Sequence, residues 1–99
     1  MNNPDIAFIA ELESIVRQRL ETRGADSYTA QLAAAGPRRI AQKVGEEAVE
    51  VALAAAGGDR QEIIDEAADL IYHLLVLLNE RGIALADVAA QLERRHAPD

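Results

Sequence analysis

Apolar residues recur along this chain at helical spacing, and glycines and prolines divide the pattern into segments. From Asp5 to about Arg23 they return every three or four positions with Glu and Arg between them, which predicts an amphipathic helix of roughly five turns. Asp26 or Ser27 can cap a short helix that runs through about Ala35. The N-terminal third therefore predicts one long helix and one short helix.

The rest of the chain predicts two longer helices and a final short one. Pro37 suits the first turn of a helix that runs to Gly57-Gly58, and Asp59 is a natural cap for the next, which should end near Arg81. A last helix covers roughly residues 85–95. We therefore predict an all-α fold, a helical bundle of four to five helices around a long antiparallel helix pair.

Acidic residues interrupt both long helices. Glu46, Glu47 and Glu50 fall within a ~100° sector of the first, while Glu66 and Asp69 fall within ~60° of each other on the second. An antiparallel pair can point these sectors at each other. Their sequence neighbours are mostly apolar, and carboxylates in such surroundings are costly unless they meet a cation. We infer that a cation belongs among them.

The composition of the chain excludes several classes of structure and binding partner. The chain has 99 residues, which we interpret as a single domain over 1–99, and 49% of them are apolar, which argues against disorder. It has no cysteine, so disulfides and thiolate metal sites are excluded. The net charge of −7 argues against binding to nucleic acid or an anionic membrane surface. No apolar run reaches the ~18 residues of a membrane span and no signal sequence is recognisable, so a cytoplasmic protein is expected.

Two nearly wholly apolar helices are hard to cover in so short a chain. The other predicted helices are too few and too short to bury them on all sides. A second copy would complete the burial most readily, so we expect a homodimer that shares a helical core.

Each candidate residue also has an ordinary structural interpretation. Glu46 with Glu50, or Lys43 with Glu47, could be surface pairs one turn apart. His73 is more typical of a hydrogen-bonded core residue than of a metal ligand. Two further acidic residues at the start of the second long helix suit the helix dipole and solvent, namely Glu62 and Asp65.

The joint acidic pattern nevertheless favours a site for a hard cation. Ligands with oxygen only, without His or Cys, favour Mg²⁺ or Mn²⁺ over zinc. Arg38, Arg39 and Lys43 cluster at the start of the same helix, where they either balance local acids or meet a phosphate. Gly57-Gly58 lacks the Lys and Ser/Thr of a P-loop, so no Gly-rich phosphate loop is present.

Several segments resemble the phosphoribosyl-ATP pyrophosphatase family of histidine biosynthesis over about residues 27–95. They are SYTAQL, AGPRRIAQKVGEEAVEVALAA, DEAADLIYHLLVLL and RGIALADVAAQLERR. The acidic pair alone would indicate only the broader superfamily of all-α nucleoside triphosphate pyrophosphatases. The flanking SYT and KVGEEA segments narrow the resemblance to the single family.

The resemblance implies Mg²⁺-dependent hydrolysis of phosphoribosyl-ATP, a small-molecule nucleotide, to phosphoribosyl-AMP and pyrophosphate, in a dimeric helical protein. By motif match it implies four metal ligands: Glu47, Glu50, Glu66 and Asp69. Catalytic roles then fall to Glu47 and Glu50, with Glu46 as a supporting ligand or as the base that orients water. Lys43 and Arg39 are the candidates for binding the substrate.

Two other functions remain open on sequence. A house-cleaning nucleoside triphosphate pyrophosphatase of the same superfamily would share the metal site and differ in substrate. A noncatalytic dimeric helical module would carry the same acids for solubility alone, and Mg²⁺ would then leave its stability unchanged.

Overall fold

The computed structural model describes residues 5–22, 24 and 27–98, and over these residues the chain forms five helices and no strand. The predicted all-α class is confirmed. The helices are α1 (Phe8–Thr22), α2 (Tyr28–Ala34), α3 (Pro37–Gly57), α4 (Arg60–Glu80) and α5 (Leu85–His96). None of the helices in the described ranges is long and apolar enough to cross a membrane.

Local sequence signals set most helix boundaries. The Ser27 side chain accepts a hydrogen bond from the Ala30 N–H (3.2 Å) and so caps α2, while Asp26, the other candidate, lies outside the described residues. Pro37 opens α3 as predicted. Gly58 ends α3 with φ of 84°, a left-handed conformation that glycine adopts most easily, and Asp59 caps α4.

The first helix is shorter than predicted at its N-terminal end. The Asp5 carboxylate accepts the Ala7 N–H (2.9 Å), and the Asp5 carbonyl accepts the Phe8 N–H (2.9 Å). This turn occupies residues that the apolar spacing had assigned to the helix, so α1 begins at Phe8. The predicted end near Arg23 lies outside the described residues.

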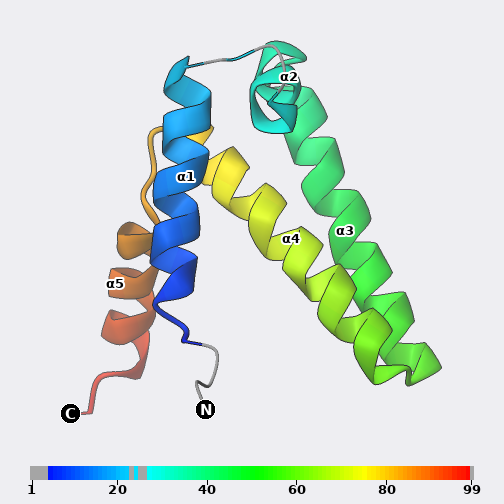
Figure 1. Ribbon diagram of the computed structural model, residues 1–99. Helices are drawn as coiled ribbons and strands as arrows, with labels where there is room; N and C mark the ends of the chain where they lie inside the picture. Colours follow the sequence, from blue (N-terminus) through cyan, green and yellow to red (C-terminus); the bar gives the residue numbers. More distant parts are fainter. Residues whose placement is uncertain (1–4, 23, 25–26, 99) are drawn as a thin grey trace.

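The core lies at one end of the molecule. It forms where α1, α2, the start of α3 and the second half of α4 converge (Figure 1). The buried apolar residues that pack into this cluster are Val16, Leu32, Ile40, Leu75 and Val76. The rest of the α3–α4 hairpin extends away from this core as an antiparallel pair (Figure 1).

The extended hairpin leaves apolar surface uncovered. Val49 and Leu53 on α3 are 59% and 66% exposed. The radius of gyration is 15.0 Å, whereas a compact domain of this length has about 13 Å. The sequence predicted burial of both long helices on all sides, and a single chain does not achieve it because α1 and α5 do not reach along the hairpin (Figure 1).

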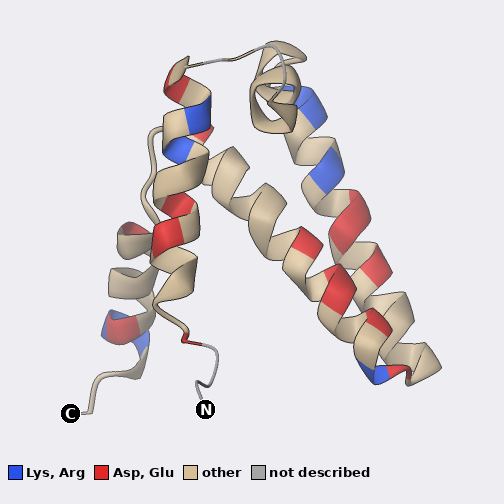
Figure 2. Cartoon of the chain, viewed as in Figure 1, with Lys and Arg blue, Asp and Glu red and all other residues tan. Residues whose placement is uncertain are grey.

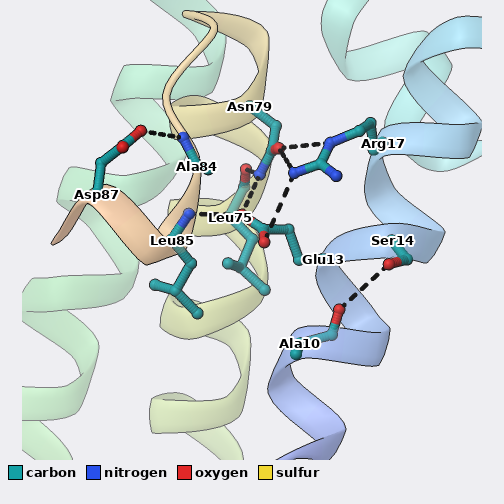
Figure 3. A network of polar contacts seen from close by, with 9 residues as sticks. All are labelled: Ala10, Glu13, Ser14, Arg17, Leu75, Asn79, Ala84, Leu85 and Asp87. Atoms are coloured by element: carbon teal, nitrogen blue, oxygen red, sulfur yellow. Dashed lines mark hydrogen bonds and ion pairs between the residues drawn. The ribbon is translucent and has the colours of Figure 1, made fainter. Parts of the chain in front are cut away.

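A polar network joins α1 to the turn between α4 and α5 (Figure 3). Glu13 Oε2 accepts hydrogen bonds from Asn79 Nδ2 (3.1 Å) and from the backbone N–H of Leu85 (2.6 Å). Arg17 donates through Nε and Nη2 to Asn79 Oδ1 at 3.3 and 3.1 Å. One carboxylate on α1 therefore fixes both the end of α4 and the start of α5.

Glu13→Ala is expected to lower the free energy of unfolding by about 1.5–3 kcal/mol, because hydrogen bonds to a charged group are worth about that much. The Leu85 N–H and one Asn79 proton would lose their acceptor. Urea denaturation checks this value. Glu13→Gln, which keeps an acceptor oxygen, should lose less; equal losses in the two variants would contradict the role given to this oxygen.

Candidate functional site

The antiparallel packing of α3 on α4 brings predicted site residues together. Glu47 on α3 and Glu66 and Asp69 on α4 each offer a carboxylate oxygen, and these oxygens lie within 4.8 Å of one another. Glu50 lies close enough to Glu66 to raise the pKa of that carboxyl. Figure 2 shows acidic residues gathered on facing stretches of α3 and α4, with basic residues nearer the α2 end of α3. Three of the four predicted metal ligands thus lie together in one cluster, and Glu50 lies beside it, outside that group of three.

Two oxygens in this cluster are buried and have no hydrogen-bond partner in the described part of the chain. They are Oε2 of Glu47 and Oε2 of Glu66. Glu47 as a whole is only 6% exposed, whereas Glu50 and Asp69 are exposed. A buried carboxylate oxygen without a partner is costly, and a divalent cation would supply the missing partner. These carboxylate oxygens therefore suit a hard divalent cation, which prefers oxygen ligands.

The cluster also changes the acidity of Glu66. The hydrogen bond with Glu50 raises the pKa of Glu66 most, followed by burial and by the negative charges of Glu50, Glu47 and Asp69, to about 7. Like charges at such short range cannot all ionise without cost. At a pH well below 7 the Glu66 carboxyl therefore carries a proton.

The basic candidates differ in their relation to the cluster. Lys43 Nζ lies 3.5 Å from Glu47 Oε1 and 3.8 Å from Glu46 Oε1, so it stands beside the buried carboxylate. Arg39 is exposed on the first turn of α3. Glu46 is exposed and accepts a hydrogen bond from Gln42 Nε2 (3.2 Å), outside the group of three carboxylates. The roles given to Arg39 and Glu46 stay predictions.

His73 is a hydrogen-bonded core residue, as the sequence indicated. It is 6% exposed; Nδ1 lies 2.8 Å from the Asp69 carbonyl oxygen and Nε2 lies 2.8 Å from the Tyr28 hydroxyl. Its Nδ1 is also 4.0 Å from Glu47 Oε1. Sequence reasoning gave no separate role to Tyr28, whose only signal was its place in the SYT segment. Glu62 and Asp65 are exposed on α4, as expected.

The match to known proteins includes both α3 and α4, the two helices that carry the cluster. A family model described as phosphoribosyl-ATP pyrophosphohydrolase matches residues 9–96. This chain belongs to that family. A phosphoribosyl-ATP pyrophosphatase of Pyrobaculum islandicum is 53% identical over 87 residues, which cover 88% of this chain and 93% of that protein. One of Methylobacterium nodulans is 55% identical over 87 residues, covering 88% and 81%.

Longer relatives also match. A histidine biosynthesis bifunctional protein of Photobacterium profundum is 52% identical over 93 residues, which cover 94% of this chain and 45% of that protein. The chain spans less than half the length of the bifunctional relatives that it matches. The family resemblance that the motifs indicated is confirmed, and the matched range contains every carboxylate of the cluster.

In this member of the phosphoribosyl-ATP pyrophosphohydrolase family, metal-free protein should lose stability as pH rises from about 5 to 7.5. The folded pKa of Glu66 is about 7 against an ordinary 4.5, so between these values the folded chain binds more protons than the unfolded chain. The free energy of unfolding therefore falls across this interval. The test compares thermal midpoints of the wild type and Glu66→Gln in EDTA over this range.

The difference between the two proteins isolates Glu66 from the other titrating groups. The wild type should lose stability relative to Glu66→Gln as pH rises. A constant difference would contradict the raised pKa.

Proposed function

We propose that this chain hydrolyses phosphoribosyl-ATP to phosphoribosyl-AMP and pyrophosphate, a step of histidine biosynthesis. Relatives named phosphoribosyl-ATP pyrophosphatase, more than 50% identical, support the reaction. The observation that carries the proposal is the convergence of Glu47, Glu66 and Asp69, two of which have a buried oxygen without a partner. Since this is a reaction of amino-acid biosynthesis on a phosphorylated nucleotide, we place the enzyme in the cytoplasm.

A divalent cation, Mg²⁺ with Mn²⁺ as a substitute, would be held by Glu47, Glu66 and Asp69, with Glu50 as the fourth ligand. When bound, such an ion neutralises phosphate charge and lowers the pKa of water. Together these carboxylates would supply the negative charge that holds such an ion.

Other side chains of this chain would orient the attacking water and neutralise phosphate charge around that position. Lys43 lies between Glu46 and Glu47, so its ammonium can turn from these acids toward a phosphate oxygen. Glu46 would accept a proton from the water that attacks the α-phosphorus, as the bond to the β-phosphate breaks and pyrophosphate leaves. Arg39, about one turn before Lys43, would bind a more distant phosphate.

The direct test supplies purified protein with phosphoribosyl-ATP and Mg²⁺. We expect release of pyrophosphate and no single phosphate. Release of single phosphate would contradict the proposed bond cleavage. Faster turnover of dUTP or dCTP in a panel of nucleoside triphosphates would replace this function with that of a house-cleaning pyrophosphatase.

We also propose that a second copy covers the exposed side of the hairpin. Gly45, Val49 and Leu53 follow one another at four-residue spacing on α3, and a Cβ at Gly45 would meet no atom within 4 Å. A helix of a second copy could therefore approach this stripe closely. Leu53→Asp should convert a dimer to a monomer in analytical ultracentrifugation.

Leu92→Asp is the matched control, since Leu92 is also an exposed leucine (51%) but lies on α5. It should leave the dimer intact. Dissociation by Leu92→Asp and not by Leu53→Asp would place the interface elsewhere.

A further inference from the structure

Tyr28, the first residue of α2, is held against α4 by contacts on several sides. Its hydroxyl lies 2.8 Å from His73 Nε2, its ring is stacked with Tyr72 (centroids 6.3 Å apart, planes at 28°), and its edge meets the His73 ring. The next residue, Thr29, is fully buried and hydrogen-bonds the Tyr72 hydroxyl. Tyr28 nevertheless remains 48% exposed. The ring is thus fixed in place and still accessible.

The hydrogen-bond directions determine what this side chain can offer to a ligand. The Asp69 carbonyl can only accept, so His73 Nδ1 carries the proton. In the neutral imidazole Nε2 is then the acceptor, and the Tyr28 hydroxyl donates to it. The donor of Tyr28 is therefore engaged inside the protein. The hydroxyl oxygen can then only accept from a ligand, and the exposed aromatic ring is the larger surface left for an incoming group; such rings bind planar π-systems.

The position of the ring relates it to the carboxylate cluster. One imidazole ring separates the Tyr28 hydroxyl from Glu47, because His73 Nδ1 lies 4.0 Å from Glu47 Oε1. Figure 2 shows the basic residues of α3 on the stretch next to α2. A nucleotide whose phosphates reach the cluster would thus have a cationic stretch and a fixed aromatic ring beside it.

We propose that Tyr28 is the platform on which the purine base of the substrate stacks. The inference rests on the proposed function for the identity of the substrate, and it adds the residue that recognises the base. His73 is a positioning residue for that platform, since it ties the Tyr28 hydroxyl to the backbone of Asp69.

The first test measures the binding of AMP with Mg²⁺ by calorimetry. Tyr28→Leu should weaken AMP binding roughly tenfold or more, because loss of base stacking has effects of that order. Tyr28→Phe keeps the ring and should lose much less than Tyr28→Leu. Phe8→Leu, at an exposed aromatic residue of α1, is the matched control and should leave the affinity unchanged.

Probes without a base separate stacking from general damage to the site. Inorganic triphosphate with Mg²⁺ should bind Tyr28→Leu as tightly as the wild type. Equal weakening for AMP and triphosphate would overturn the platform and assign Tyr28 a structural role. Equal losses in Tyr28→Phe and Tyr28→Leu would overturn it too, since the hydroxyl and not the ring would then matter.

Tyrosine fluorescence can report the contact between the Tyr28 ring and the base directly. The chain has two tyrosines and no tryptophan, so in Tyr72→Phe the ring of Tyr28 is that of the only remaining tyrosine, which is excited at wavelengths where phenylalanine does not absorb. AMP should change that fluorescence saturably and ribose 5-phosphate should not, with free tyrosine correcting for absorption by adenine. If this variant does not fold, the AMP-dependent change is measured in the wild type and should disappear in Tyr28→Phe.

Turnover distinguishes the two proposals. With phosphoribosyl-ATP, Tyr28→Leu should raise KM roughly tenfold with kcat within about twofold of the wild type. Wild-type turnover with unchanged AMP binding in Tyr28→Leu would overturn the platform alone. AMP binding that depends on the Tyr28 ring, without turnover of phosphoribosyl-ATP by the wild type, would overturn the proposed function alone.

Discussion

Glu47→Gln is expected to lower kcat/KM for phosphoribosyl-ATP about a thousandfold. Glu47 is the most buried carboxylate of the cluster, and its Oε2 has no hydrogen-bond partner among the residues that the structure describes. An amide at this place cannot replace a charged ligand, and charge stabilisation by a held cation is worth several kcal/mol, with about 1.4 kcal/mol for each tenfold in rate. Steady-state kinetics of pyrophosphate release measure the loss.

The folded state should tolerate this change. Gln has the shape of Glu, and its neutral head removes repulsion with Glu66 but also loses the ion pair with Lys43 (3.5 Å), so the metal-free thermal midpoint should change little. Glu62→Gln is the control because Glu62 is an exposed acid at the start of α4; its activity should match the wild type. Full activity in Glu47→Gln, or equal losses in both variants, would refute the role of the cluster.

Mg²⁺ should raise the thermal midpoint of the wild type markedly. At a concentration of 100 times Kd, a ligand that binds only the folded state adds about 2.7 kcal/mol. For a chain of this size that corresponds to roughly 10 °C or more. Calorimetric scans with Mg²⁺ and with EDTA measure the shift, and Mn²⁺ should reproduce it.

Two variants decide where the ion binds. Glu66→Gln should abolish the shift, because Glu66 contributes to the three-carboxylate group. Glu62→Gln should retain it. An unchanged midpoint in the wild type would favour a noncatalytic helical module, and a shift that survives Glu66→Gln would place the ion elsewhere.

Sequence reasoning located the helices because their boundaries depend on nearby residues. Pro37, Gly58 and Asp59 act within a few positions, through a fixed φ, a left-handed turn and a side-chain cap. The acidic cluster was predictable for a related reason. Helical spacing put Glu47 on one sector of α3 and Glu66 on one sector of α4, and a short turn made the two helices antiparallel.

Contacts between distant segments could not be predicted in the same way. Tyr28 meets His73 across 45 positions, and Glu13 meets Leu85 across 72, so no local rule pairs them. The exposure of Glu50 could not be predicted from the sequence either. Its apolar neighbours indicated burial, but whether a helix face is covered depends on how far other helices extend along it.

Because the α3–α4 hairpin extends away from the core, the carboxylate cluster also affects how firmly its two helices are held together. Beyond the core, the two helices are held mainly by each other, and like charges push them apart at Glu47 and Glu66. A cation seated there would turn that repulsion into a cross-link between the helices. Binding of the ion would then also stiffen the outer half of the hairpin. The two helices would become rigid in the same step that prepares the site for catalysis.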